Sequence, residues 1–329
     1  MLKDYLNLEL FESNVEKKAP RDGFGEGMLM AGEKYENIVA LVADLKDSMR
    51  LTKFEERFPE RFVEMGVSEQ NMISVASGLA ASGKIPFAAS YAVFSPGRTW
   101  EHLKVSVAIN NVPVQIVGGH AGFSAGPYGS THQSLEDIGL IRILPNMRVL
   151  SPCDYEETKK AVLAMADDPK PTYIRFEKFE TPMITTKETP FEIGKGQIMW
   201  ESKDPQVGII ATGSSLYEAI LAAKDLDERG IESIVVNIHT IKPLDIDLIN
   251  RVSRMTGCLV TVENHQIAGG LGSLVSETLT QNGPVPIEIV AVEDSFGESG
   301  EPDELKKKHG LTRENIVDRA KKAILRKTS

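Results

Sequence analysis

Residues 61–71 read RFVEMGVSEQN, and this stretch decides how the rest of the sequence is interpreted. A short apolar run is stopped by Gly66, and Ser68 is placed to cap a helix that follows. Apolar side chains then recur at helical spacing, and Gly83 is typical of a helix end. Glu69 therefore falls in the first turn of a helix with an apolar face. On its own, such a carboxylate can simply complement the helix dipole.

The rest of the chain alternates apolar runs with amphipathic segments. Residues 38–43 read IVALVA, a near-continuous apolar run that is typical of a parallel strand covered on both faces. This alternation predicts an α/β fold with two doubly wound, mostly parallel sheets. The expected strands are 38–43, 85–93, 112–117, 147–150, 172–176, 207–211, 233–238, 258–263 and 287–292. The expected helices are 23–32, part of 46–61, 68–83, 98–110, 135–141, 154–166, 216–229, 244–255, 269–279 and the tail from 301.

The chain is expected to form two domains. Residues 179–192 contain two prolines and four threonines without any period, which is typical of a linker. We therefore divide the 329 residues into 1–185, which includes an N-terminal arm, and 186–329. Each part is long enough to bury a core of its own.

Composition excludes several classes of function. The formal net charge is −10, from 37 Lys and Arg against 47 Asp and Glu, which disfavours a nucleic-acid or anionic-membrane partner. The sequence has no run of about eighteen apolar residues and no signal peptide, so a cytoplasmic protein is expected. The two cysteines, Cys153 and Cys258, are far apart, and no metal-ligand spacing is present, so no metal site is assigned to this chain.

Candidate functional residues follow the expected strands of the first half. Ligands bind beyond the carboxyl ends of the strands in open parallel sheets. A glycine-rich loop, residues 118–133, carries His120 and His132, and its glycines let the backbone approach a ligand closely. Complete P-loop, dinucleotide-binding, HExxH and GxSxG motifs are all missing. The candidates at this sheet edge are Asp44, Ser48, Tyr91, Phe94, Arg98, His120, His132 and Arg175.

About ten short motifs, in order along nearly the whole chain, resemble the transketolase family. They are ADLKDS at Ala43, GVSEQNM at Gly66, SYAVFSPGR at Ser90, GSTHQ at Gly129, LPNMRVLSPCD at Leu144, YIRFEK at Tyr173, ATGS at Ala211, IKPLD at Ile241, VENH at Val262 and FGESG at Phe296. The resemblance is to the second half of a full-length transketolase, which holds the pyrimidine-binding and C-terminal domains. The GDG…N motif, which in the family binds the diphosphate of thiamine diphosphate and its metal, does not occur here.

The resemblance implies one subunit of a split transketolase. Such an enzyme moves a two-carbon ketol unit between sugar phosphates, as in the pentose phosphate pathway. It would share thiamine diphosphate with a separate N-terminal subunit that binds the diphosphate and Mg²⁺ (or Ca²⁺). The expected assemblies are an inactive homodimer of this chain alone and a heterotetramer with the partner.

The resemblance also implies roles for the candidate residues. Glu69 would hydrogen-bond the aminopyrimidine ring and help to activate the cofactor, and His120 and His132 would contact the donor sugar near the reacting carbons. The implied cofactor-binding residues are Glu69, Phe94, Tyr91 and Asp44, with Phe94 stacking on the pyrimidine. The implied sugar-phosphate ligands are Arg21, Ser48, His120, His132 and Arg175.

Three positions depart from the family pattern and leave the donor sugar open. Tyr128 stands where the family commonly has an aspartate that reads a donor hydroxyl, and Gly97 replaces a further aromatic residue. Arg98 has a counterpart in the related 1-deoxyxylulose-5-phosphate synthases. The alternatives are therefore such a synthase, the β subunit of a 2-oxoacid dehydrogenase, or a non-catalytic partner. The GSTHQ and LPN runs fit the dehydrogenase less well, and the retained Glu69 and His120 argue against a non-catalytic partner.

Overall fold

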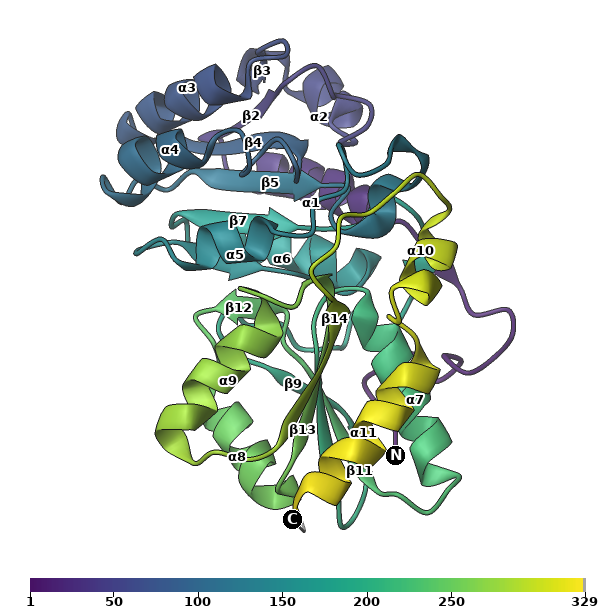
Figure 1. The fold of residues 1–329 in the computed structure, drawn as a ribbon. Helices are drawn as coiled ribbons and strands as arrows, with labels where there is room; N and C mark the ends of the chain where they lie inside the picture. The colour runs from purple at the N-terminus through teal and green to yellow at the C-terminus, as the bar shows by residue number, and fades with distance from the viewer. Residues whose placement is uncertain (328–329) are drawn as a thin grey trace.

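The apolar runs form two mainly parallel sheets, one in each half of the molecule. The structure is a computed structural model that describes residues 1–327, and the two halves lie one above the other in Figure 1. The predicted fold class, α/β with two doubly wound sheets, is confirmed. Within residues 1–327, no helix combines the length and apolarity needed to cross a bilayer.

The first half is built on a seven-stranded sheet with the order β12-β6-β7-β5-β4-β2-β3. Its strands are parallel except β12, which runs antiparallel to β6. The strands are β2 Ile38–Val42, β3 Phe62–Glu64, β4 Ile85–Tyr91, β5 Gln115–Gly119, β6 Arg148–Leu150, β7 Thr172–Arg175 and β12 Thr240–Lys242. The helices of this half are α1 Pro20–Lys34, α2 Thr52–Arg57, α3 Glu69–Ala81, α4 Trp100–His102, α5 Asp137–Arg142 and α6 Tyr155–Asp167. Short 3₁₀ helices span Pro59–Arg61 and Phe123–Tyr128.

The second half is built on a five-stranded sheet with the order β14-β13-β10-β11-β9, in which only the pairing of β9 is antiparallel. Its strands are β9 Gln197–Glu201, β10 Val207–Ala211, β11 Ser233–Asn237, β13 Leu259–Gln266 and β14 Ile287–Val292. Its helices are α7 Ser215–Asp227, α8 Ile246–Thr256, α9 Leu271–Asn282, α10 Pro302–Lys308 and α11 Arg313–Lys327. A small antiparallel pair, β1 Lys17–Lys18 with β8 Thr181–Pro182, completes the strands.

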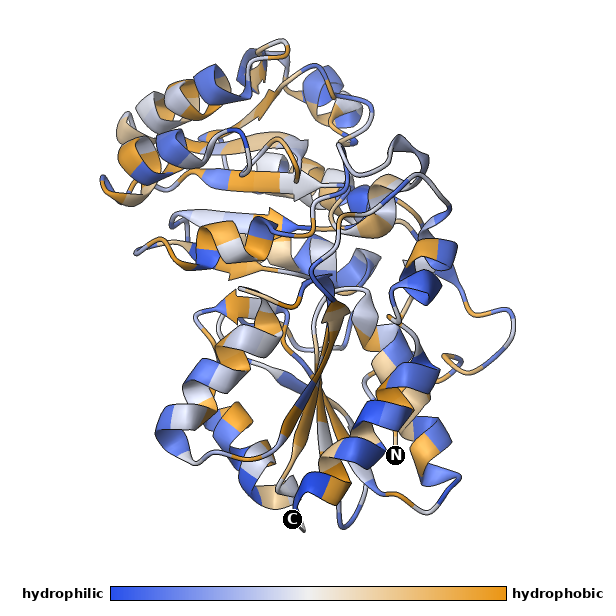
Figure 2. Ribbon diagram, viewed as in Figure 1, coloured by the Kyte–Doolittle hydropathy of each residue, from blue (hydrophilic) through white to orange (hydrophobic). Residues whose placement is uncertain are grey.

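Burial explains why the predicted strands form. Every residue of β2, β4, β5 and β10 is buried, because helices cover both faces of each sheet. Figure 2 shows apolar residues concentrated on the strands and polar residues on the outer faces of helices such as α8 and α11. Burial of each large aliphatic side chain contributes roughly 1.5–3 kcal/mol, so these runs dominate the choice of fold.

Some local predictions are wrong. Ser68 does not cap α3, because its Oγ donates to the carbonyl oxygen of Met65 at 2.7 Å instead of accepting from the helix backbone. The expected helix 98–110 is a short α4 followed by a π-helical stretch, Leu103–Ala108. The expected strand 112–117 begins and ends later, at Gln115–Gly119.

The two halves share structural elements. β12 belongs to the second half of the chain but pairs with β6 of the first sheet. The N-terminal arm packs the other way, since Leu2 of the first part forms a bridge with Trp200 of the second. The division between residues 185 and 186 stays a prediction about chain order, since these crossings join the two parts.

Candidate active site

Four neighbouring parallel strands bring the candidate residues to one edge of the first sheet. β3, β2, β4 and β5 lie side by side and point the same way, so the residues that follow them meet at their carboxyl ends. Asp44 follows β2, Glu69 follows β3 by a short turn, Phe94 follows β4 and His120 follows β5. The topology therefore gathers residues that are up to 76 positions apart in the sequence, from Asp44 to His120.

Glu69 is the first residue of α3, and its carboxylate is buried beside an arginine. Its side chain is only 2% exposed, and the Nη1 atom of Arg98 lies 2.6 Å from its Oε2. The Arg98 side chain is 45% exposed, and its Cζ lies 4.7 Å from the centre of the Phe94 ring. The guanidinium thus connects the carboxylate to the aromatic ring.

Five rings form a continuous surface next to this pair, which we call the aromatic wall: Tyr91, Phe94, His120, Tyr128 and His132. Tyr91 stacks on His120 with ring centres 3.9 Å apart, and it lies nearly parallel to Phe94 at 6.1 Å. His132 meets Phe94 edge-on at 5.4 Å and lies 5.3 Å from Tyr128. Such a wall suits a flat heterocycle and presents imidazole nitrogens beside it.

His120 is held in an unusual environment. Its backbone has a φ of 59°, and its side chain is fully buried, with no hydrogen-bond partner for Nδ1 or Nε2 among residues 1–327. Burial, with the positive charges of Lys178, Arg21 and Arg50, lowers the pKa of His120 from 6.5 to about 3. The imidazole is therefore neutral at neutral pH. Because buried polar atoms without partners cost free energy, its two nitrogens are suited to a polar ligand.

We expect this neutral histidine to make stability depend on pH. Between pH 6.5 and about 3 the unfolded chain binds a proton at His120 that the folded chain does not. Its contribution to the free energy of unfolding is therefore full above this window and falls with pH by at most about 1.4 kcal/mol per pH unit. Urea denaturation at several pH values in this range measures the free energy of unfolding. Its slope against pH should be shallower for His120→Gln than for the natural chain. His102→Gln is the control, and equal slopes for His120→Gln and the natural chain would contradict the assignment.

Basic side chains surround His120. Arg21 is half-buried, and its Nε has no hydrogen-bond partner in the described part of the chain. Burial, together with the charge of Arg50, lowers the pKa of Arg21. Arg50 is paired with Asp22 at 2.6 Å. The Nζ of Lys178 lies 4.8 Å from the centre of the Tyr128 ring. Our sequence reasoning missed Lys178, although it lies in the YIRFEK run.

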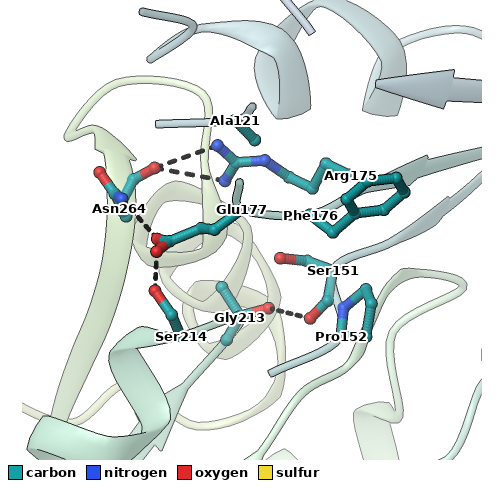
Figure 3. Close-up of a pocket in the computed structure, with 10 residues that line it drawn as sticks. Ala121, Ser151, Pro152, Arg175, Phe176, Glu177, Gly213, Ser214 and Asn264 are labelled. Carbon is teal, nitrogen blue, oxygen red and sulfur yellow. Dashed lines mark hydrogen bonds between the residues drawn. The ribbon is translucent and has the colours of Figure 1, made fainter. Parts of the chain in front are cut away.

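The structure places Arg175 away from the aromatic wall. Its Nε lies 2.8 Å from Asp137 Oδ2, an ion pair whose angle does not make a hydrogen bond, and its Nη1 and Nη2 atoms each donate to the carbonyl oxygen of Asn264 at 3.2 Å. β7 pairs with β5 on the side away from β4, and the Arg175 side chain at its end contacts Asn264 of the second half. Figure 3 shows Arg175 turned toward Asn264. Its role as a sugar-phosphate ligand stays a prediction that these contacts do not favour.

Glu177, like Arg175, contacts residues of the second half. It accepts hydrogen bonds from Ser214 Oγ and from Asn264 Nδ2, the latter at 2.9 Å, and it pairs with Lys306 at 3.0 Å. Burial alone would raise the pKa of Glu177, but the Lys306 charge and these hydrogen bonds outweigh it and hold the pKa below the ordinary value. The small pocket in Figure 3 is therefore lined by groups that satisfy one another.

Ser48 and Asp44, the other two predicted residues, differ in their contacts with the aromatic wall. Ser48 Oγ lies 2.8 Å from the hydroxyl of Tyr91, so it belongs to the aromatic wall's surroundings. Asp44 is exposed, has a φ of 56°, and its N–H donates to Glu64 at 2.8 Å. It lies at the same sheet edge, just after β2.

The second half supports the loop that carries both histidines. Gln133, next to His132, donates to the carbonyl oxygens of Gly126 at 3.1 Å and Glu298 at 2.8 Å. The FGESG motif at residues 296–300 thus packs directly on the GSTHQ motif. Figure 1 shows the segment before α10 reaching up to this part of the first half.

Comparison with known proteins places the chain. The transketolase pyrimidine-binding domain matches residues 16–183, and the transketolase C-terminal domain matches residues 194–316. The chain belongs to the transketolase family. It is 43% identical over 305 residues to a transketolase C-terminal section of Methanocaldococcus jannaschii, covering 92% of this chain and 95% of that protein.

Other members of the transketolase family show which part of the enzyme this chain represents. It is 39% identical to a 6-deoxy-6-sulfo-D-fructose transketolase subunit of Clostridium sp. (strain MSTE9), covering 96% of this chain and 98% of that subunit. Human transketolase is 34% identical, but the match covers 92% of this chain and only 48% of that enzyme. The solved split-gene transketolase described as an inactive β4 tetramer superposes with a TM-score of 0.88 at 39% identity, over 94% of this chain and 99% of that chain. The chain is thus a transketolase-type subunit of the split kind.

Proposed function

We propose that this chain carries the pyrimidine-binding half of a thiamine-diphosphate-dependent transketolase, which transfers a two-carbon ketol unit between sugar phosphates. The observation that carries this proposal is the buried Glu69 carboxylate beside the aromatic wall at one sheet edge. Two chemical needs of an aminopyrimidine are met there: a flat apolar face and a carboxylate that can hold a proton against a ring nitrogen.

The residues present fit the cofactor's pyrimidine ring. Phe94 offers the face and Glu69 the carboxylate. When bound, thiamine diphosphate would supply the electron sink for breaking and forming the carbon–carbon bond next to a ketose carbonyl. In this proposal Glu69 orients the ring and holds its proton.

The two histidines would act on the sugar. His120 is neutral at neutral pH, so its nitrogens can accept a proton from one donor hydroxyl or hydrogen-bond another. His132 lies against Phe94 and Tyr128, where the sugar would extend away from the cofactor. The tight contact of Tyr91 with His120 and Ser48 would fix the imidazole in place.

A second subunit would supply what this chain lacks. The chain has no GDG…N motif for the diphosphate and metal, and its relatives are named as subunits or sections. We therefore propose an N-terminal subunit that binds the diphosphate and Mg²⁺ (or Ca²⁺), with two copies of each chain in the working enzyme. The solved relative described as an inactive tetramer supports an inactive assembly of this chain alone, although we expect a homodimer. A cytoplasmic location stays part of this proposal.

The donor is proposed to be a ketose with an anionic end, held by Arg21 and Lys178. Neither side chain forms an ion pair among residues 1–327, and both lie within electrostatic range of His120. Relatives are named for 6-deoxy-6-sulfo-D-fructose and for apulose 4-phosphate. Tyr128, in place of the aspartate, presents a ring that packs between His132 and Lys178.

We expect Lys178→Met to raise the KM for xylulose 5-phosphate about tenfold, because a charge-assisted contact to the phosphate is lost. The KM for erythrulose, a ketose without a charged group, should stay unchanged. Steady-state kinetics of the complex measure both constants, and Lys203→Met, at an exposed site, is the matched control. An equal change in KM for both donors would show that Lys178 does not bind the anionic end of the sugar.

A reconstitution assay tests the proposed function. The chain is mixed with its candidate partner, thiamine diphosphate and Mg²⁺, and ketol transfer from xylulose 5-phosphate to ribose 5-phosphate is followed. Activity should appear in the mixture and not with either chain alone. Turnover by this chain alone would contradict the need for a partner. A mixture that consumes pyruvate and transfers no ketol unit would favour a 1-deoxyxylulose-5-phosphate synthase or a 2-oxoacid dehydrogenase.

A further inference from the structure

Arg98 makes two contacts at once, both with residues of the proposed cofactor site. Its Nη1 donates to Glu69 Oε2 at 2.6 Å, and its Cζ lies 4.7 Å from the centre of the Phe94 ring. The Glu69 side chain is 2% exposed and that of Arg98 is 45% exposed. The guanidinium is therefore the outward-facing partner of a buried carboxylate.

A guanidinium resembles an aminopyrimidine in the two properties that matter here. It is planar and delocalised, so it stacks on an aromatic face, and it carries N–H donors at its edge. Glu69 and Phe94 use both properties when they bind Arg98. The same carboxylate and the same ring are the groups proposed to receive the cofactor's ring.

We infer that Arg98 competes with the aminopyrimidine of thiamine diphosphate for Glu69 and Phe94, and has to leave this place when the cofactor binds. The inference rests on the proposed function. Because the Arg98 side chain is 45% exposed, it can return to water when the cofactor's ring takes its place beside the buried carboxylate. Arg98 thereby keeps the buried carboxylate paired until the cofactor replaces it.

A glycine shapes the turn that presents Arg98. A Cβ atom at Gly97 would clash with the carbonyl oxygen of Val93, so a side chain larger than glycine is not accommodated in this turn. The N–H of Arg98 donates to the carbonyl oxygen of Phe94 at 3.0 Å, which closes the turn. Arg98 therefore starts one turn away from the ring that it covers, and its long side chain can swing outward.

The test is calorimetric titration of thiamine diphosphate, with Mg²⁺, into the complex of this chain with its diphosphate-binding partner. Removing the competitor in Arg98→Ala should lower the Kd about tenfold, since a charge-assisted hydrogen bond to Glu69 no longer has to be broken. Arg98→Gln keeps an N–H donor but loses the charge, so its Kd should lie between those of the natural chain and Arg98→Ala. Arg254→Ala, at an exposed position of α8, should leave the Kd unchanged.

Each outcome of this titration decides the point. Tighter binding by the folded Arg98 variants, as checked by thermal unfolding, supports the competition. Equal or weaker binding overturns it, and a raised KM for the donor in the same variants would instead make Arg98 a substrate ligand. A natural complex that does not bind thiamine diphosphate at all would contradict the proposed function itself.

Discussion

Replacement of Glu69 by Ala should reduce ketol transfer by the reconstituted complex about a thousandfold, while the chain stays folded. The expected loss is large because, in the proposed function, the Glu69 carboxylate, buried at 2% exposure, holds the proton of the cofactor's ring. Glu69→Gln should lose nearly as much, since an amide cannot hold that proton. The kcat of the complex, measured with saturating thiamine diphosphate, is the quantity to compare.

Asp247→Ala is the matched control for Glu69. Asp247 also lies in the first turn of a helix, α8, but it is exposed and belongs to the second half. If Glu69 merely complements the dipole of α3, both variants should lose only a few tenths of a kcal/mol of stability and neither should lose activity. Retention of kcat in Glu69→Gln would therefore remove the catalytic assignment.

Replacement of Asp137 by Ala should lower the free energy of unfolding by about 3–5 kcal/mol, because it leaves a buried arginine without its counterion. The Arg175 and Asp137 side chains are 5% and 0% exposed, and the hydroxyl of Tyr173 also donates to Asp137 at 2.7 Å. The sequence has two tryptophans, Trp100 in the first half and Trp200 in the second. Trp100 fluorescence in a Trp200→Phe background reports the half that contains Asp137.

The double variant Asp137→Leu with Arg175→Met should recover much of that stability, since replacing both partners of a buried pair is often neutral. Asp167→Ala, which removes an exposed pair with Lys34, is the control and should cost under about 1 kcal/mol. Arg175→Met alone separates the two roles of Arg175. A large loss of donor affinity with unchanged stability would restore the sequence-based prediction that Arg175 binds the sugar phosphate.

Nine of the strands were predictable because buried parallel strands are continuous apolar runs, whereas β3 and β9 were not among the expected strands. Residues 38–43 illustrate this, and the structure forms β2 at Ile38–Val42. β12 was not predictable, since Thr240–Lys242 is three residues long and pairs with a strand about ninety residues earlier. Pairings of that kind depend on how the two halves dock, which no local pattern records.

The candidate site was predictable to the extent that chain topology fixes it. Residues that follow β4 and β5 had to meet at one sheet edge, and Phe94 and His120 do so; Glu69 joins them because it follows β3, which was not among the expected strands. Arg175 follows a strand of the same sheet, but the second half docks over that strand end and engages its side chain. The ion pair between Arg98 and Glu69 also needed the structure, because side-chain direction after a turn is not set by spacing.

The most direct test of the central claim is the structure of the mixed complex with thiamine diphosphate and Mg²⁺. We predict that the pyrimidine ring lies on Phe94, that a ring nitrogen is within hydrogen-bond distance of the Glu69 carboxylate, and that Arg98 has moved off both. The diphosphate and the metal should contact the other subunit. A pyrimidine ring bound elsewhere, with the ion pair between Arg98 and Glu69 intact, would contradict the account.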